Sequence, residues 1–216
     1  MIRKYALISG FLLLFFGCHN SAENTNEQST NQIFTKSVGG PIAKDLADSW
    51  VARKRSHSGG REETFTVTAD KLLQLLNQTD NKLGVNFHFA QDPGEQQHLF
   101  IAPVKSDLKS WTNGPVLDAA TNEFADATQA MDWALSHKNQ HPDGPWSVFF
   151  GSDLIDEITS KEGLDKIDIK PGEKEDGSDA LLLFVSCNTQ TTSGKLKSEE
   201  STYDQGALCP RLCPVE

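Results

Sequence analysis

Residues 85–104 read VNFHFAQDPGEQQHLFIAPV, two apolar segments on either side of a polar turn. The first segment, Val85–Phe89, has apolar side chains at every second position, and the second, His98–Val104, is mostly apolar. The residues at 92–94, Asp-Pro-Gly, are typical of tight turns, so the stretch predicts an antiparallel β-hairpin. Antiparallel sheet is therefore expected in the fold.

A second hairpin of the same kind follows later in the chain. Its strands are Ile167–Ile169 and Ala180–Ser186, and its turn is Asp-Gly-Ser at 176–178. Both hairpins belong to a pattern that runs through the chain twice, over residues 41–105 and again over residues 124–188. The chain is thus predicted to contain two related units.

The two units match position by position. Each opens with an amphipathic helix that carries a tryptophan, Trp50 in the first and Trp133 in the second, 83 positions apart. A polar loop, a short strand and a short helix follow before the hairpin. Each unit is therefore predicted as helix, strand, helix, strand, strand. The same shift relates three further pairs: Phe65 and Val148, Val67 and Phe150, and Asp70 and Asp153.

This order of elements predicts the α+β fold class. Two such units form either two small lobes or one pseudo-symmetric sheet with helices on one face. Residues 106–123 are then a linker, and residues 189–216 are a polar loop that leads into a cysteine-containing tail. Trp50 and Trp133 recur at matching helix positions, which favours core packing. Trp111 lies in the linker and is the candidate for contact with a ligand.

Residues 1–17 have the organisation of a secretory leader. A positive head, Arg-Lys at 3–4, precedes an apolar stretch over residues 6–16 that is too short to remain across a bilayer. Gly17 supplies the small residue before a cleavage site, and Cys18 follows directly. This arrangement resembles the lipobox of bacterial lipoproteins.

The lipobox resemblance implies that the thiol of Cys18 carries lipid and that Cys18 becomes the new N-terminus, anchored to the membrane. The alternative is a cleaved secretory leader with an incidental cysteine. Residues 18–40 are rich in Asn, Ser, Thr, Glu and Gln, which predicts a flexible tether. His19 and Asn20 follow the cysteine without an acidic residue, which favours the outer membrane, facing the periplasm or the cell surface.

The chain is acidic, with 30 Asp and Glu against 20 Lys and Arg and a formal net charge of −10. Nucleic-acid binding requires clustered Lys and Arg, so a nucleic-acid partner is not expected. The only basic cluster, residues 53–55, lies at a predicted helix end, where cations complement the helix dipole.

Four cysteines occur, Cys18, Cys187, Cys209 and Cys213. The spacing of the last two is C-x3-C, which is neither the redox motif nor a zinc knuckle. A local disulfide between Cys209 and Cys213 is the preferred prediction. The alternative joins one of them to Cys187, and either pairing leaves an odd thiol.

A wider resemblance rests on the segment Thr64–Val104, on Tyr203-Asp204 and on the tail Cys-Pro-Arg-Leu-Cys-Pro at 209–214. Together they are similar to a family of uncharacterised small exported proteins of Gram-negative bacteria. Those proteins carry one such unit and a similar tail, whereas this chain carries a second unit. The resemblance implies no activity or cofactor.

His88 and His98 flank the turn of the first hairpin and are the candidate metal ligands. With Glu95 or Asp92 they would form a site for zinc or copper. His88 alternates with two phenylalanines, however, which predicts that its ring faces solvent on a half-buried strand.

The sequence carries no nucleophile elbow, no phosphate-binding loop and no H-E-x-x-H motif. It therefore predicts no cofactor and favours a non-catalytic binding or structural module at the cell envelope, with a protein or glycan partner. The alternative is an envelope hydrolase whose acid and base are dispersed Asp and Glu residues in a cleft between the two units.

Overall fold

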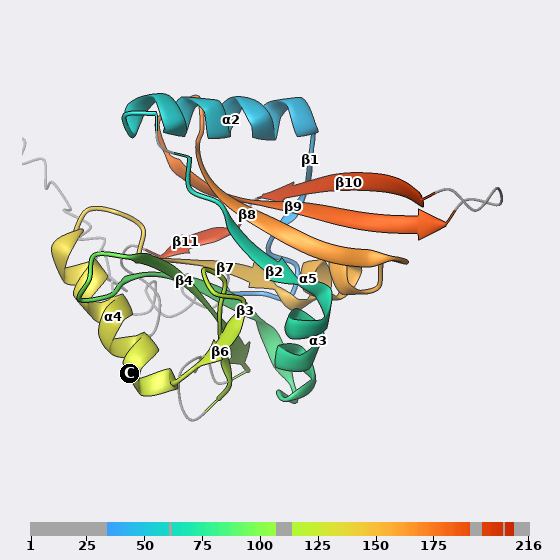
Figure 1. Ribbon diagram of the computed structural model, residues 1–216, viewed down its shortest axis with the longest axis horizontal. Coiled ribbons are helices and arrows are strands. Elements are labelled where there is room, and N and C mark those ends of the chain that lie inside the picture. Colours follow the sequence, from blue (N-terminus) through green and yellow to red (C-terminus); the bar gives the residue numbers. More distant parts are fainter. Residues whose placement is uncertain (1–33, 61, 107–113, 191–195, 205, 210–216) are drawn as a thin grey trace, which may run out of the picture.

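The computed structural model describes residues 34–60, 62–106, 114–190, 196–204 and 206–209. Two antiparallel sheets lie face to face, and helices cover their outer faces and one end (Figure 1). The predicted α+β class is therefore confirmed.

One sheet has five strands in the order β1-β10-β9-β8-β2, and the other has six in the order β11-β7-β3-β4-β5-β6. The strands of the five-stranded sheet are β1 (Gly40–Ile42), β10 (Leu196–Asp204), β9 (Asp179–Gln190), β8 (Leu164–Glu173) and β2 (Phe65–Thr68). Those of the six-stranded sheet are β11 (Ala207–Cys209), β7 (Ser147–Gly151), β3 (Lys82–Gln91), β4 (Gln97–Lys105), β5 (Val116–Asp118) and β6 (Glu123–Ala125).

Each sheet takes strands from both units of the repeat. β2 of the first unit pairs with β8 of the second, with Phe65 opposite Ile169. β7 of the second unit pairs with β3 of the first, with Val148 opposite Phe87. Phe65 and Val148 are equivalent positions, so the two units exchange their first strands reciprocally. The fold thus has two sheets, and neither sheet belongs to a single unit.

The long helices cover the outer faces of the sheets (Figure 1). α2 (Lys44–His57) packs Trp50 on the five-stranded sheet, and α4 (Ala127–Gln140) packs Ala130 and Ala134 on the six-stranded sheet. The small side chains of α4 allow the helix to approach the strands closely. Trp133 is partly buried and packs against the same cluster, so both tryptophans pack as predicted.

The short helices lie at one end of the sandwich, where their apolar faces meet both sheets (Figure 1). They are α3 (Ala69–Asn77) and α5 (Ser152–Thr159). α3 buries Leu75 and α5 buries Ile158 completely. Both helices follow the exchanged strands directly, which places them at equivalent positions of the two units.

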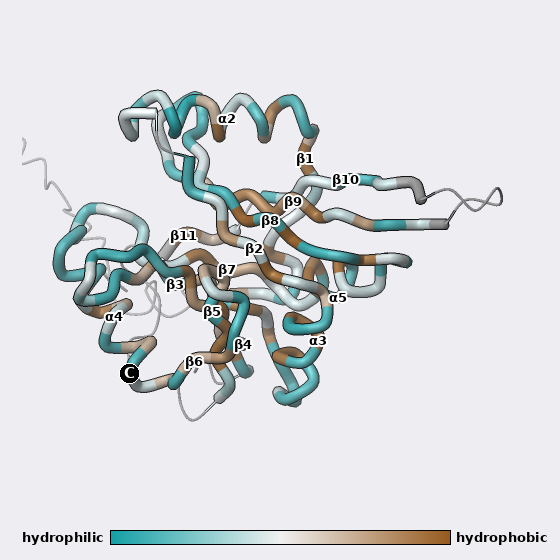
Figure 2. Tube along the Cα trace, in the orientation of Figure 1, coloured by the Kyte–Doolittle hydropathy of each residue, from teal (hydrophilic) through white to brown (hydrophobic). Residues whose placement is uncertain are grey.

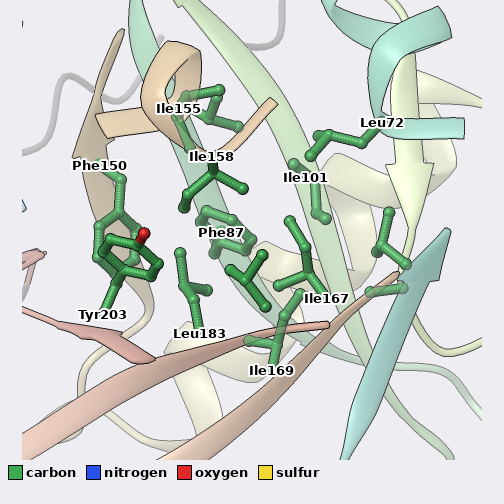
Figure 3. Packing of buried hydrophobic residues seen from close by; sticks show 14 of the residues in the cluster. Leu72, Phe87, Ile101, Phe150, Ile155, Ile158, Ile167, Ile169, Leu183 and Tyr203 are labelled. Carbon is green, nitrogen blue, oxygen red and sulfur yellow. The ribbon is translucent and has the colours of Figure 1, made fainter. Parts of the chain in front are cut away.

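The main apolar core fills the space between the sheets, where hydrophobic residues gather (Figure 2). Phe87 of β3 and Phe150 of β7 pack edge to face, with ring centroids 5.5 Å apart. Ile167 and Ile169 of β8 lie in the same cluster as these rings (Figure 3). Burying one such side chain contributes roughly 1.5–3 kcal/mol relative to exposure.

Three segments differ from the sequence prediction. The predicted linker contains β5 and the first residue of β6, and these strands extend the sheet from β4. The predicted polar loop contains β10 and β11, which pair with β9 and β7. The predicted tether, residues 18–40, includes Phe34, whose side chain is 5% exposed and whose ring lies 5.0 Å from that of Phe149. β5 is apolar at Val116 and Leu117, whereas β10 is mostly polar and carries little local sign of a strand. Within the described ranges, no helix is long and apolar enough to cross a membrane.

Candidate functional site: a cleft at the junction of the two units

α2 and α4 both end on the side of the molecule away from α3 and α5 (Figure 1). A cavity of about 230 Å³ opens there. The first unit contributes Lys54 from α2, Glu63 from the following loop, and Phe89 from β3. The second contributes His137 from α4 and Asp179 from β9. The cleft is therefore built jointly by the two units.

Equivalent positions of the repeat face this cleft. Lys54 and His137 are 83 positions apart and occupy matching places on α2 and α4. Phe89 and Pro171 occupy matching places on β3 and β8, which begin 82 positions apart, at Lys82 and Leu164. These two pairs of equivalent positions thus carry different chemistry in the two units.

Two imidazole rings line the α4 side of the cleft. His137 and His141 stack with their ring centroids 4.3 Å apart, and Nδ1 of His141 lies 3.1 Å from the carbonyl oxygen of His137. Burial, with a smaller contribution from His141, lowers the pKa of His137 to about 4. His137 is therefore neutral near pH 7. Its Nδ1 is buried and has no hydrogen-bond partner in the described part of the chain.

Two charged groups of the cleft form an ion pair with each other, and a third has no such partner in the described chain. Lys54 Nζ lies 2.5 Å from Asp179 Oδ1, so these two charges neutralise each other. Glu63 is partly buried and forms no hydrogen bond or ion pair with any residue of the described ranges. The cleft therefore presents one uncompensated carboxylate.

A second cluster of polar groups lies beneath α4. His98 of β4 and Asp118 of β5 are both buried, with His98 Nδ1 2.8 Å from Asp118 Oδ2. Asp118 also accepts hydrogen bonds from the Ala120 amide and the Thr121 hydroxyl. The Trp133 ring lies over His98 at 4.9 Å. Both side chains are buried, and their contacts are with neighbouring residues of the fold. We therefore assign this pair a structural role.

The predicted metal ligands His88 and His98 share one face of the hairpin, since they lie opposite Phe100 and Ala90. The prediction that His88 faces solvent is wrong. Its side chain is 1% exposed, because the face that it shares with His98 is covered and the Trp146 ring lies 5.4 Å from its own. Burial lowers the pKa of His88 to about 3.

Of the carboxylates considered with this histidine pair, Asp92 places Oδ2 3.8 Å from Nε2 of His98, whereas Glu95 is exposed in the turn. In the described ranges, no three His, Cys, Asp or Glu side chains come close enough to hold a metal ion. Zinc or copper binding by His88 and His98 therefore stays a prediction from sequence.

The remaining candidate residues are only partly described. Cys187 is a buried free thiol. Its predicted alternative pairing with a tail cysteine stays a prediction, because the side chains of Cys209 and Cys213 lie outside the described part of the chain. Cys209 ends β11, where its backbone pairs with Ser147. Cys18, Cys213 and the ligand candidate Trp111 lie outside the described residues.

A hydrolase would need a carboxyl group that remains protonated near neutral pH. The pKa is lowered for four carboxyl groups of the described chain: Glu62 by a hydrogen bond from Lys170, Asp70 by Thr68, Glu175 by Trp50 and Asp176 by Ser178. These groups are held ionised, and none of them lines the cleft. Displaced carboxyl pKa values therefore do not support the hydrolase alternative.

No protein-family model matches the chain, and no curated protein and no solved structure matches it significantly. Sequence reasoning did not single out Lys54, Glu63 or Asp179. The 83-residue shift was the available signal, since it relates Lys54 to His137 and so marks two helix ends that meet.

Proposed function

We propose that the protein is a lipid-anchored, non-catalytic binding module of the cell envelope, and that its cleft receives the ligand. The observation that carries this proposal is the Glu63 carboxylate of the cleft, which is partly buried and has no hydrogen-bond or ion-pair partner in the described chain. Half-buried polar groups in folded proteins normally have partners. A concave site that leaves such a group open is the arrangement that ligands complete.

The lining of the cleft favours binding over catalysis. Its described residues include no serine, threonine, cysteine or tyrosine that would act as a nucleophile. A pair of catalytic carboxylates would have to be Glu63 and Asp179, but Asp179 is bound to Lys54. The membrane anchor comes from the lipobox resemblance at Cys18 and positions this binding site at the envelope.

Replacing Cys18 with serine is expected to release the protein from the membrane fraction, because acyl chains are the proposed anchor. Intact-mass spectrometry of the membrane-extracted wild type should show a chain that begins at Cys18 and carries acyl groups. A Cys213→Ser variant, processed and membrane-bound like the wild type, is the matched control. A full-length, unacylated wild-type mass would contradict the anchor.

Blocking the cleft is expected to abolish ligand binding. Gly144 lines the cleft, and a Cβ at this position would make only ordinary contacts with His141, at 3.7 Å, so Gly144→Phe places a ring there without backbone strain. A library of small organic fragments, screened by protein NMR, should yield ligands that shift cleft amides. Gly144→Phe should weaken them at least about tenfold, which is the loss of roughly 1.4 kcal/mol of binding free energy.

The matched control for this blockade is Ser160→Phe, which adds the same ring at an exposed position after α5, at the other end of the sandwich. It should leave fragment affinity unchanged. Fragments that bind equally well to both variants would place the binding surface elsewhere and overturn the role of the cleft.

A further inference from the structure

We propose that the cleft recognises an alkylammonium group, an apolar stem that ends in a positively charged amine. This inference rests on the binding role proposed above and names the class of its ligand. Such a group is found at the end of a lysine side chain and in free diamines.

The charges of the cleft select a cation. Lys54 is the basic residue of the lining, and its charge is already compensated by Asp179 at 2.5 Å. An anion entering the cleft would therefore meet Glu63 and Asp179 without a free cation to pair with. An ammonium group would instead pair with Glu63, which has no other partner in the described chain. Pairing the partly buried charge of Glu63 with an ammonium group is energetically favourable.

The histidine wall is compatible with a bound cation. His137 is neutral near pH 7 and does not repel a positive charge. Its Nδ1 is enclosed by protein, so the ammonium group would pair with the carboxylate of Glu63.

The remaining walls suit an apolar stem. Phe89 presents an aromatic ring, which also favours a nearby cation through its π face, and Pro145 and Pro171 add apolar surface. The cavity volume of about 230 Å³ accommodates a short alkyl chain with its head group. The net charge of −10 for the whole chain further attracts cations towards the protein.

Three probes that share one stem separate the head groups: n-pentylamine, 1-pentanol and pentanoate, titrated into the protein at pH 7 and followed by NMR. We expect millimolar dissociation constants, as is usual for ligands of this size, with the amine about fivefold tighter than the alcohol and pentanoate weakest. Pentanoate or pentanol binding as tightly as the amine would overturn the inference.

Glu63→Gln should remove the preference for the amine over the alcohol while leaving the alcohol affinity within about twofold. Glu62→Gln is the matched control, because Glu62 is a neighbouring carboxylate that pairs with Lys170 outside this cleft. A preference for the amine that survives in Glu63→Gln would contradict the assignment. If Gly144→Phe weakens all three probes but no head-group preference exists, the binding role stands and only the ligand class fails. If Gly144→Phe affects none of them, both proposals fail.

Two further probes separate the sources of the amine. Nα-acetyl-lysine methylamide that shifts the same amides as pentylamine supports a lysine side chain of a partner protein. Cadaverine that binds more tightly than pentylamine supports a free diamine. Failure of both to bind where pentylamine binds would contradict recognition of a biological alkylammonium group.

Discussion

Replacing Asp118 with alanine is expected to lower the free energy of unfolding by about 3 kcal/mol, the lower end of the range for breaking a buried polar pair. Asp118 accepts hydrogen bonds from three groups: it lies 2.8 Å from Nδ1 of His98, 2.9 Å from the amide of Ala120 and 3.1 Å from the hydroxyl of Thr121. The variant leaves His98 and the Ala120 amide without this acceptor in a site closed by α4. Urea unfolding followed by tryptophan fluorescence measures the loss.

Asp126→Ala is the matched control for this variant. Asp126 accepts a hydrogen bond from the Gln129 amide at the start of α4, at an exposed position, so its loss should cost about 1 kcal/mol. Asp118→Asn keeps one acceptor oxygen and should fall between the two. An Asp118→Ala loss no larger than that of Asp126→Ala would show that the buried pair does not stabilise the fold.

Acidification from pH 7 to pH 4 is expected to cost about 3 kcal/mol of stability through His88 alone. Burial lowers the pKa of His88 to about 3 in the folded protein, whereas an unfolded histidine titrates near its model value of 6.5. Between these two values the unfolded chain binds a proton that the folded chain cannot. Stability from this source is therefore complete above pH 6.5 and is lost progressively as the pH falls towards 3.

About 2 kcal/mol of this loss should already appear between pH 7 and pH 5, where most carboxyl groups remain ionised. His137, with a pKa of about 4 and partial exposure, adds a smaller loss of the same sign. Unfolding free energies measured across this range test the slope. His88→Phe and His88→Leu should both flatten it, whatever their own stability.

Phe100→Leu is the control for the acid experiment. Phe100 lies opposite His88 in the β3–β4 pairing, so its truncation perturbs the same face without removing a titrating group. The Phe100→Leu variant should lower the free energy of unfolding but leave the dependence of that free energy on pH unchanged. An unchanged slope in both His88 variants would show that this histidine does not carry the acid sensitivity.

Much of the secondary structure was predictable because its signals are local. The turn at 92–94 and the apolar residues beside it predicted the β3–β4 hairpin, and the 83-residue shift predicted matching helices, which α2 and α4 confirm. β10 was not predictable in this way. Residues 197–201 of this strand are all polar, and the strand is seen through its pairing with β9, where Tyr203 lies opposite Leu183.

The candidate site was less predictable than the fold. His137 and His141 looked like the polar end of a helix, and Lys54 belonged to a basic cluster with an ordinary structural explanation. Their common cleft depends on α2 and α4 ending on the same side of the sandwich. Side-chain types predicted the chemistry that each residue can perform, but distance decided which residues act together.

The sequence by itself determined the α+β class, the repeated unit and the two hairpins, because turn chemistry and apolar periodicity act over a few residues. Only the tertiary structure decided that β2 and β7 exchange units, that His88 is buried, and that Glu63 and His137 share a cleft. Strand partners and burial depend on which apolar faces meet after the chain collapses. That choice is made between segments far apart in the sequence, where local patterns carry no information about the partner.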